Sequence, residues 1–307
     1  MCALQKAVYL YTSVPYNYLT MPDTFLPKRP VVAAYPRMPE AFAEAQAMAA
    51  YLKEKGIDAP HGSLYDENLR KRVRAGEFDL LVMAGGDGSV LRAGNLCASS
   101  KVPILGVNLG KLGFLIQVER DDWREYFDKL LNGEAWIENR MMLHVEYVRA
   151  GEMLGNWEAL NEVVVGRGQV LRPVRLSASV DGRLLTSYVA DGLIAATATG
   201  STAYALAAGG PILPPELRNI LLVPIAPHLS VDRAVVLAEG STVSIRVNGE
   251  NAVLSVDGQP SITLMEDDNI HVRAAEVTTQ FVRFGDPGYF YRNLTAHMNE
   301  NSLGLPR

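Results

Sequence analysis

Short apolar runs alternate with helix-length segments over the first part of the chain. Val31–Tyr35, Leu80–Ala84 and Ile104–Asn108 have the length and composition of strands buried on both faces of a parallel sheet. Between the first two, the alanine-rich segment Pro39–Lys55 predicts a helix, and a further helix is expected after Asp87. This alternation of strands and helices predicts an α/β domain with a doubly wound, Rossmann-like sheet.

A different pattern begins near Arg140. Leu143, Val145 and Tyr147 alternate with polar residues, which is the period of a half-exposed strand. We therefore divide the chain into an N-terminal α/β domain over residues 1–139, a β-rich domain over 140–278 and a C-terminal segment over 279–307.

Turn signals recur in the second domain. Asp181-Gly182 separates segments 175–180 and 183–189, and Asn248-Gly249 separates 242–247 from 251–256. Asp-Gly and Asn-Gly favour two-residue hairpin turns, because both residues tolerate positive φ. Asp257-Gly258 follows at once. These pairs predict antiparallel hairpins and an all-β, β-sandwich-like C-terminal domain.

The composition is that of a globular protein long enough for two cores. Of 307 residues, 48% are hydrophobic and 21% are charged, close to globular averages. The formal net charge of −5 argues against nucleic acid or an anionic membrane as a partner. No apolar run approaches the roughly 20 residues that cross a bilayer, and the first residues lack the pattern of a secretory signal.

Cysteine and histidine indicate neither a disulfide framework nor a fixed metal site. The two cysteines, Cys2 and Cys97, fit a reducing compartment and predict a cytoplasmic protein. The five histidines are scattered, and no two stand at metal-ligand spacing. The chain also has no Ser-His-Asp hydrolase signature and no Walker-type Gly-Lys-Ser loop.

The segment Gly85-Gly86-Asp87-Gly88-Ser89 directly follows a predicted strand. Glycines let the backbone approach a phosphate closely, and a following helix directs N–H groups toward an anion. An acid in such a loop would repel phosphate by itself. It fits a role facing Mg²⁺ or accepting a proton from a hydroxyl nucleophile. The alternative is a Gly-Asp-Gly surface turn without a ligand.

A second stretch rich in small and hydroxyl-bearing residues runs from Asp191 to Pro211. A buried-strand run after Asp191 ends in a glycine-containing turn, and Ser201 or Thr202 is well placed to cap a helix there. Small side chains leave room for a ligand that hydroxyl and N–H groups can bind. A tight helix-packing seam explains the alanines equally well.

Four stretches together resemble the NAD kinase family, enzymes that use ATP or polyphosphate to make NADP from NAD. They are residues 85–89, Asn108–Leu115, Asn161–Val164 and Asp191–Pro211, in the family's order and at about its spacing. The similarity runs from roughly residue 29 to residue 293. The first motif is shared with diacylglycerol, sphingosine and phosphofructokinase-type enzymes, whereas the second and fourth are more specific.

This resemblance implies that Asp87 accepts the proton of the adenosine ribose 2′-hydroxyl as that oxygen attacks the γ-phosphate. It also implies that the loop binds the phosphates of ATP, with Mg²⁺ or another divalent cation carried on ATP rather than held at a fixed protein site. The implied phosphate-binding residues are Gly85, Gly86, Gly88 and Ser89. The alternative role for Asp87 is to bond the backbone of its own loop.

The resemblance also implies a set of NAD contacts. Asn161 would pair with an adenine edge and Glu162 would accept from ribose hydroxyls, while Tyr204 would stack on a base. The implied set is Asp87, Gly88, Asn161, Glu162, Arg172, Val189, Asp191, Thr202, Ala203, Tyr204, Ala207 and Gln259. The matches at Arg172 and Gln259 rest on single positions, and a solvated surface cation explains Arg172 almost as well.

Four places depart from the family pattern, one of them the stretch Ser230–Ala234, which differs from the usual Arg-Pro sequence. Ala198 replaces the usual proline, which removes a residue of fixed φ. Val189 stands where many members have a polar or basic residue, and Ala207 where serine is common. None of these alters Asp87 or the glycines, so the implied chemistry is kept. The affinity for the dinucleotide and the preference for NAD over NADH stay open.

The resemblance further implies that residues 279–307 return to the first domain. It implies a homodimer or homotetramer with NAD sites completed near subunit contacts. Two other functions stay open at this point. A lipid or sphingoid-type kinase would need an apolar acceptor pocket, and a catalytically silent dinucleotide-binding sensor would not need Asp87.

Overall fold

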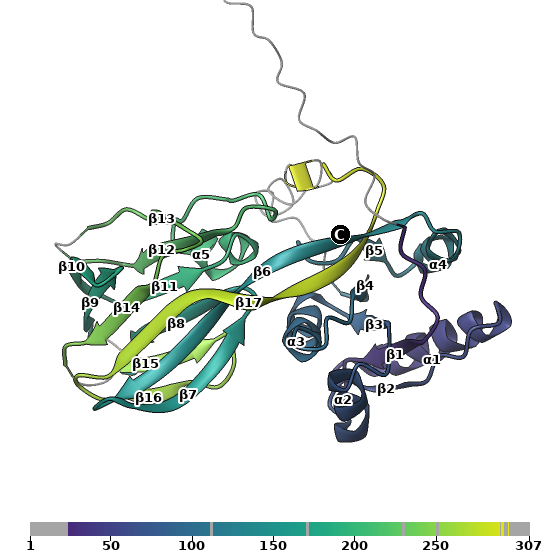
Figure 1. The fold of residues 1–307 in the computed structure, drawn as a ribbon, viewed down its shortest axis with the longest axis horizontal. Coiled ribbons are helices and arrows are strands. Elements are labelled where there is room, and N and C mark those ends of the chain that lie inside the picture. The colour runs from purple at the N-terminus through teal and green to yellow at the C-terminus, as the bar shows by residue number, and fades with distance from the viewer. Residues whose placement is uncertain are drawn as a thin grey trace, which may run out of the picture.

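The computed structural model describes residues 24–110, 113–169, 172–228, 231–249, 252–288, 290, 291 and 294. Two lobes are joined by a pair of long strands (Figure 1). One lobe is α/β and the other is built almost entirely of strands, as the sequence predicts. Within these residues, no helix combines the length and the apolar character needed to cross a membrane.

Parallel strands form the sheet of the N-terminal lobe in the order β2-β1-β3-β4, with β5 beside β4. Their bounds are β1 Pro30–Ala34, β2 His61–Ser63, β3 Leu80–Gly85, β4 Ile104–Asn108 and β5 Val118–Glu119. The three predicted strands are thus confirmed to within one residue as β1, β3 and β4.

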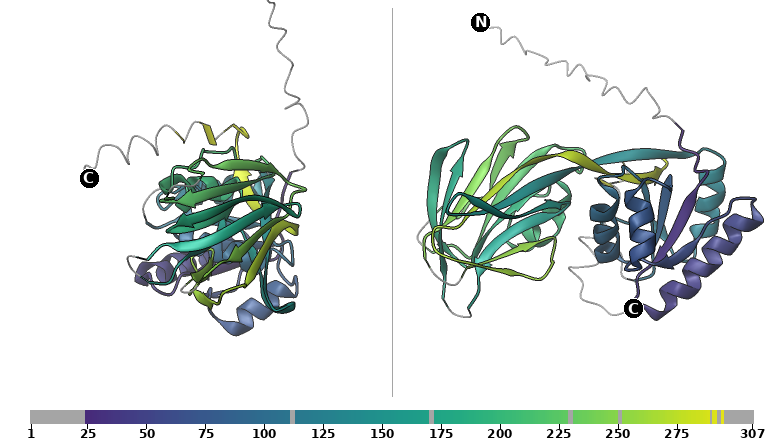
Figure 2. Two further views of the ribbon diagram at one scale, coloured as in Figure 1. Left: turned by 90° about the vertical axis from the view of Figure 1, so that its left-hand side faces the viewer. Right: turned by 60° about the horizontal axis from the view of Figure 1, so that its bottom comes forward.

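Helices cover both faces of this sheet (Figure 2). Met48 of α1 and Phe127 of α4 pack in a core on one face, while Leu69 of α2 and Val90 of α3 pack in a core on the other. Their bounds are α1 Pro39–Glu54, α2 Glu67–Arg74, α3 Asp87–Cys97 and α4 Trp123–Leu131. Helices on both faces of a parallel sheet make the lobe doubly wound.

Two long strands, β6 (Ala135–Arg149) and β17 (Asn269–Phe284), run through both lobes. They pair antiparallel along their length, with a shift in register between Ala274 and Thr278. Near its end β17 also pairs in parallel with β4, through Phe281 and Ile104. The divisions at residues 139/140 and 278/279 therefore fall inside continuous strands, and these boundaries stay predictions from sequence.

Two sheets face each other in the C-terminal lobe. The first continues the N-terminal sheet through β17, and within the described residues the combined sheet has 11 strands. Its further strands are β7 Glu152–Ala159, β9 Val174–Val180, β10 Arg183–Ala190 and β14 Val243–Val247.

The second sheet is antiparallel throughout, and six of its strands lie in the described part of the chain, in the order β13-β12-β11-β8-β15-β16. Their bounds are β8 Glu162–Arg167, β11 Gly192–Ala196, β12 Asn219–Ile225, β13 Val235–Ala238, β15 Ala252–Val256 and β16 Ile262–Leu264. Apolar faces of both sheets share one core, with Leu176 and Ile245 from the first sheet and Leu193 and Leu254 from the second. The β-sandwich-like prediction is confirmed.

The two predicted hairpins have different outcomes. Asp181-Gly182 does join the antiparallel pair β9 and β10, with Val180 opposite Arg183. The hairpin expected at Asn248-Gly249 is wrong, because β14 belongs to the first sheet and β15 to the second. Both edges of β14 are already paired, with β9 and β17. The chain therefore crosses between the sheets after residue 247 instead of folding back.

Candidate active site

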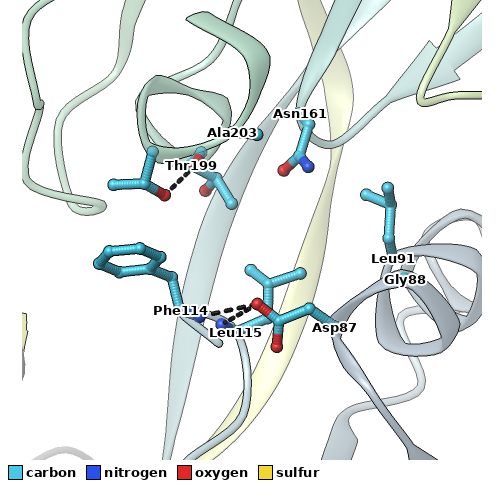
Figure 3. A pocket seen from close by; sticks show the side chains of 9 residues that line it. Asp87, Gly88, Leu91, Phe114, Leu115, Asn161, Thr199 and Ala203 are labelled. Carbon is cyan, nitrogen blue, oxygen red and sulfur yellow. Dashed lines mark hydrogen bonds between the residues drawn. The ribbon is translucent and has the colours of Figure 1, made fainter. Parts of the chain in front are cut away.

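A cavity of about 180 Å³ lies between the two lobes, where small-molecule sites are common. One wall comes from the start of α3 and the segment after β4, the other from the residue before β8 and the turn after β11 (Figure 3). The lining residues are Asp87, Gly88, Leu91, Phe114, Leu115, Asn161, Thr199, Thr202 and Ala203. The predicted catalytic residue and part of the predicted NAD set therefore meet at one place.

Asp87 is the first residue of α3 and directly follows the β3–Gly86 turn. Its Oδ2 accepts hydrogen bonds from the backbone N–H groups of Phe114, at 2.7 Å, and Leu115, at 3.2 Å. These donors lie in a segment far along the chain, not in the loop of Asp87. The two charge-assisted bonds fix the carboxylate at the cavity wall.

A hydrogen bond made by Ser89 stabilises the glycine loop. The Ser89 hydroxyl donates to the carbonyl oxygen of Gly86 at 2.6 Å, and Ser89 is 3% exposed. A Cβ at Gly85 would lie 2.2 Å from Ser89 Oγ, so a larger residue here would displace the Ser89 hydroxyl from this position. A Cβ at Gly86 would meet nothing within 4 Å. Of the predicted phosphate-binding residues, Gly88 lines the cavity. Phosphate contacts by Gly85, Gly86 and Ser89 stay predictions.

The buried carboxylate of Asp257 anchors the start of β8. Its Oδ1 accepts from the N–H groups of Asn161, at 2.9 Å, and Glu162, at 3.0 Å. Its Oδ2 accepts from the N–H of Leu160, at 2.8 Å, and from Asn95 Nδ2, at 2.9 Å. Because Asn95 belongs to α3, one side chain connects both lobes beside the cavity. The Asp-Gly pair in the sequence indicated only a turn here.

Glu162 is buried directly beside this anchor and is 8% exposed. Among the described residues, its Oε2 has no hydrogen-bond partner. Burial, and secondly the charge of Asp257, raise the pKa of Glu162 to about 7. Glu162 does not line the cavity, although its neighbour Asn161 does. A buried carboxyl with a raised pKa at the edge of a cavity is typical of functional sites.

The residues after β11 do not form the capped helix that the sequence predicts. Thr199–Thr202 is a 3₁₀ turn, η1, and α5 is only the four residues Tyr204–Ala207, with Ala203 at its N-cap. Ser201 Oγ instead accepts from the N–H of Leu213 at 2.9 Å. The expectation of Ser201 or Thr202 as a helix cap is therefore wrong, because the hydroxyls hold the turn together.

This turn packs tightly against Asn161. A Cβ at Gly200 would lie 2.1 Å from the carbonyl oxygen of Asn161, so only glycine permits this approach. Thr199, Thr202 and Ala203 thereby reach the cavity beside Asn161. The small residues of this stretch therefore allow close packing, and that packing places Thr199, Thr202 and Ala203 at the cavity wall.

The remaining predicted NAD contacts lie outside this cavity. Tyr204 is 45% exposed. Asp191 forms an ion pair with Arg167 at 2.9 Å, at the opposite end of β11 from η1; five strand residues separate the ends by about 17 Å. The others that do not line it are Arg172, Val189, Ala207 and Gln259. Their roles stay predictions.

Some lining residues escaped the sequence reasoning. Phe114 and Leu115 belong to the motif Asn108–Leu115, so the signal was present, but they act on Asp87 through backbone N–H groups that any residue offers. Leu91 and Thr199 also line the cavity without having been singled out. Thr199 belongs to the hydroxyl-rich stretch Asp191–Pro211, so a signal was present there, whereas nothing in the local sequence distinguishes Leu91 from a core position.

Both lobes of the chain are similar in sequence to known proteins. Residues 33–135 match the model of the ATP-NAD kinase N-terminal domain, and residues 160–284 match that of the ATP-NAD kinase C-terminal domain. The chain is 38% identical to an NAD kinase of Chloroflexus aurantiacus over 258 residues, covering 84% of this chain and 93% of that protein. It is 38% identical to an NAD kinase of Heliobacterium modesticaldum over 262 residues, covering 82% and 92%.

Solved structures show the same fold. An NAD kinase from Archaeoglobus fulgidus in complex with ATP superposes with a TM-score of 0.71 at 26% identity, over 88% of this chain and 98% of that one. Yeast NADH kinase complexed with NADH superposes with a TM-score of 0.76 at 24% identity, over 92% and 90%.

Proposed function

Because this chain belongs to the NAD kinase family and phosphorylates NAD to NADP, we propose that Asp87 is the general base of the transfer. The observation that carries this proposal is its carboxylate, which two backbone N–H groups hold at the wall of the cavity between the lobes. A carboxylate held within reach of a hydroxyl accepts its proton as the new bond forms.

The reaction follows from this placement. The adenosine ribose 2′-oxygen attacks the γ-phosphorus of ATP, and its proton passes to Asp87 as the O2′–P bond forms and the bond to the ADP oxygen breaks. Gly88, at the exposed start of α3, lies where a backbone can approach the phosphates. The 2′-hydroxyl must then stand between Asp87 and the γ-phosphate.

The residues of this site fit Mg²⁺ that enters bound to the phosphates of ATP. Mg²⁺ prefers oxygen ligands and is commonly held by one or two carboxylates together with substrate phosphates. Four of the lining side chains carry oxygen atoms, those of Asp87, Asn161, Thr199 and Thr202, and Asp87 is the only carboxylate among them. Among the described residues, no group of three or more His, Cys, Asp and Glu side chains could hold a metal by itself. A bound Mg²⁺ would neutralise charge on the phosphates.

The adenosine half of NAD is proposed to lie against the wall formed by Asn161, Thr202 and Ala203. Their amide, hydroxyl and small side chains suit the edge of a base and a ribose. Glu162 would then accept from a ribose hydroxyl, which would provide the partner that its buried Oε2 lacks in the described structure. A lipid acceptor would need an apolar pocket, and these side chains are polar or small. Membership of the NAD kinase family also argues against the lipid kinase alternative.

A homodimer or homotetramer would complete the NAD site. Asp191 stands at the far end of β11 from the cavity of its own subunit, so a second subunit is the means of bringing such residues near. The C-terminal lobe also exposes large apolar side chains on β7 and β10, including Met153 at 52% and Leu184 at 67%. Light scattering on the purified protein tests this assembly. We also place the enzyme in the cytoplasm, which fits its two cysteines.

A coupled assay with an NADP-specific dehydrogenase tests the base. Asp87→Asn should lower kcat by about 10²-fold or more, while the KM for NAD changes much less. Asp58→Asn removes the same charge at an exposed position outside the cavity and should leave turnover unchanged. Near-native turnover of Asp87→Asn would show that the base lies elsewhere.

A further inference from the structure

Behind the cavity walls, Glu138 of β6 lies between Arg140 of the same strand and Arg283 of β17. Glu138 Oε2 is 2.7 Å from Arg283 Nε and 2.9 Å from Arg140 Nη2. All three residues are buried, at 9%, 2% and 2% exposed. Burial acts to raise the pKa of Glu138, but the two guanidinium groups lower it to about 2. The cluster is therefore fully charged.

The strand pairing explains why these side chains meet. In the ladder between β6 and β17, Glu138 is opposite Phe281 and Arg140 is opposite Thr279. Arg283 stands two residues beyond Phe281 on the same side of its strand, so it is the diagonal neighbour of Glu138. The cluster thus sits where the two long strands pass from one lobe to the other.

Each arginine also reaches one wall of the cavity. Arg140 Nη1 donates to Thr199 Oγ1 at 3.1 Å. Arg283 Nη1 donates to the carbonyl oxygen of Leu115 at 2.9 Å. Thr199 and Leu115 both line the cavity, from opposite lobes (Figure 3). The N–H of Leu115 in turn donates to Asp87 Oδ2. A continuous polar chain therefore leads from Thr199 to Asp87 behind the site.

Stability is a poor explanation for this cluster. The desolvation of buried charges offsets most of their attraction, and well-packed apolar residues are often equally or more stabilising. Arginine has instead a geometric advantage here, because its planar guanidinium can hold a carboxylate and a second acceptor at once. Both arginines use this fork in the same way, with Glu138 on one side and a cavity residue on the other.

We infer that Arg140 and Arg283, joined through Glu138, are positioning residues that fix the spacing between the Asp87 wall and the Thr199 wall. The inference rests on the proposed role of Asp87, because proton transfer and in-line attack depend on that spacing. A displacement of about 1 Å in such a site can lower a rate by about 10²-fold. The cluster would act on kcat without touching either substrate.

The sharpest test removes the hydrogen bond between Arg140 and the hydroxyl of Thr199. Thr199→Val keeps the shape of the side chain and deletes the hydroxyl, whereas Thr199→Ser keeps the hydroxyl. We expect Thr199→Val to lower kcat by about tenfold with little change in either KM, and Thr199→Ser to restore most of the rate. Equal kcat values for wild type and Thr199→Val would overturn the inference.

A double-mutant cycle shows whether Thr199 acts through Arg140. Arg140→Lys keeps the charge beside Glu138 but cannot make the same fork. If the two residues form one unit, the double variant should be no slower than the slower single variant. If Thr199 contacts substrate by itself, the effects will multiply and a KM will rise, and the inference fails.

Thermal unfolding of each variant separates positioning from folding, and the Thr199→Val and Thr199→Ser pair remains decisive if Arg140→Lys proves unstable. The role of Asp87 is judged independently. Normal turnover of Asp87→Asn would refute the base, yet the coupling between Arg140 and Thr199 would still be measurable. The two failures are therefore distinguishable.

Discussion

The carboxylate of Asp87 lies directly over Gly113: a Cβ at residue 113 would stand 2.2 Å from Asp87 Cγ and 2.2 Å from its Oδ2. No real Cβ contact is that short, so the absence of a side chain at Gly113 creates the place that the carboxylate occupies. The N–H groups of the next two residues then hold it there. Gly113 and the two backbone N–H groups together therefore fix the position of the Asp87 carboxylate.

Gly113→Ala should therefore lower kcat by about 10²-fold, because the new methyl group would displace the Asp87 carboxylate. The matched control is Gly110→Ala, where a Cβ would meet nothing closer than Met38 Cε at 3.7 Å. Steady-state kinetics with both substrates saturating measures the difference. Comparable turnover for the two alanine variants would contradict the proposed role of Gly113 in positioning Asp87.

Glu162→Gln should raise the KM for NAD by roughly tenfold or more, since a lost charge-assisted hydrogen bond costs about 1–3 kcal/mol. The KM for ATP should hardly move, and saturating NAD should recover most of kcat. Glu152→Gln, on an exposed position of β7, serves as the control. Loss of kcat at saturating NAD would instead give Glu162 a part in the chemistry.

The same substitution should change how stability depends on pH. The folded-state pKa of Glu162 is about 7, above its ordinary value of 4.5. The folded protein therefore binds this proton more tightly than the unfolded chain. Wild-type stability from this group is present below about pH 4.5 and is lost as the pH rises to about 7, by on the order of 3 kcal/mol.

Glu162→Gln replaces the titrating carboxyl with an amide that does not titrate, so the stability of the variant relative to wild type should increase as the pH rises from about 4.5 to about 7. Urea unfolding of both proteins without ligands, at several pH values, measures the difference. Parallel stability curves across this range would mean that Glu162 titrates normally.

Tyr204→Ala should raise the KM for NAD by roughly tenfold, the effect expected from losing a base-stacking contact of about 1–3 kcal/mol. Because Tyr204 is 45% exposed, its removal should leave the melting temperature nearly unchanged. Tyr291→Ala removes another exposed tyrosine, at 53%, and should leave the KM for NAD as it is. An unaltered KM in Tyr204→Ala would remove this residue from the NAD site.

Local patterns predicted the N-terminal lobe well because its strands are short, continuous and buried on both faces. A run such as Leu80–Ala84 has the length of a strand and is followed by glycine, and both features favour a buried strand over a helix. The prediction was wrong at Asn248-Gly249, where the local turn signal was clear. The identity of the strands already paired with β14 decides that connection, and they come from distant parts of the chain.

The site shows the same limit. Asp87 and Asn161 were predicted to lie near one ligand, and they line one cavity. The role of Asp257 could not be predicted, because its four hydrogen bonds go to α3 and to the start of β8, far away in sequence. The Arg140–Glu138–Arg283 cluster depends likewise on the register between β6 and β17. Contacts of this kind arise only once the sheets have formed.

The position of β17 has a consequence for synthesis of the protein. In the combined sheet β17 lies between β4 and β14 and also pairs with β6, so it is a central strand of both lobes. On the ribosome, neither lobe can complete this sheet before residue 284 has emerged. Until then the nascent chain carries open strand edges that are prone to wrong pairing. The combined sheet can therefore be completed only after β17 has emerged, and a gene fragment that lacks this strand is expected to leave the edges of β4, β6 and β14 unpaired.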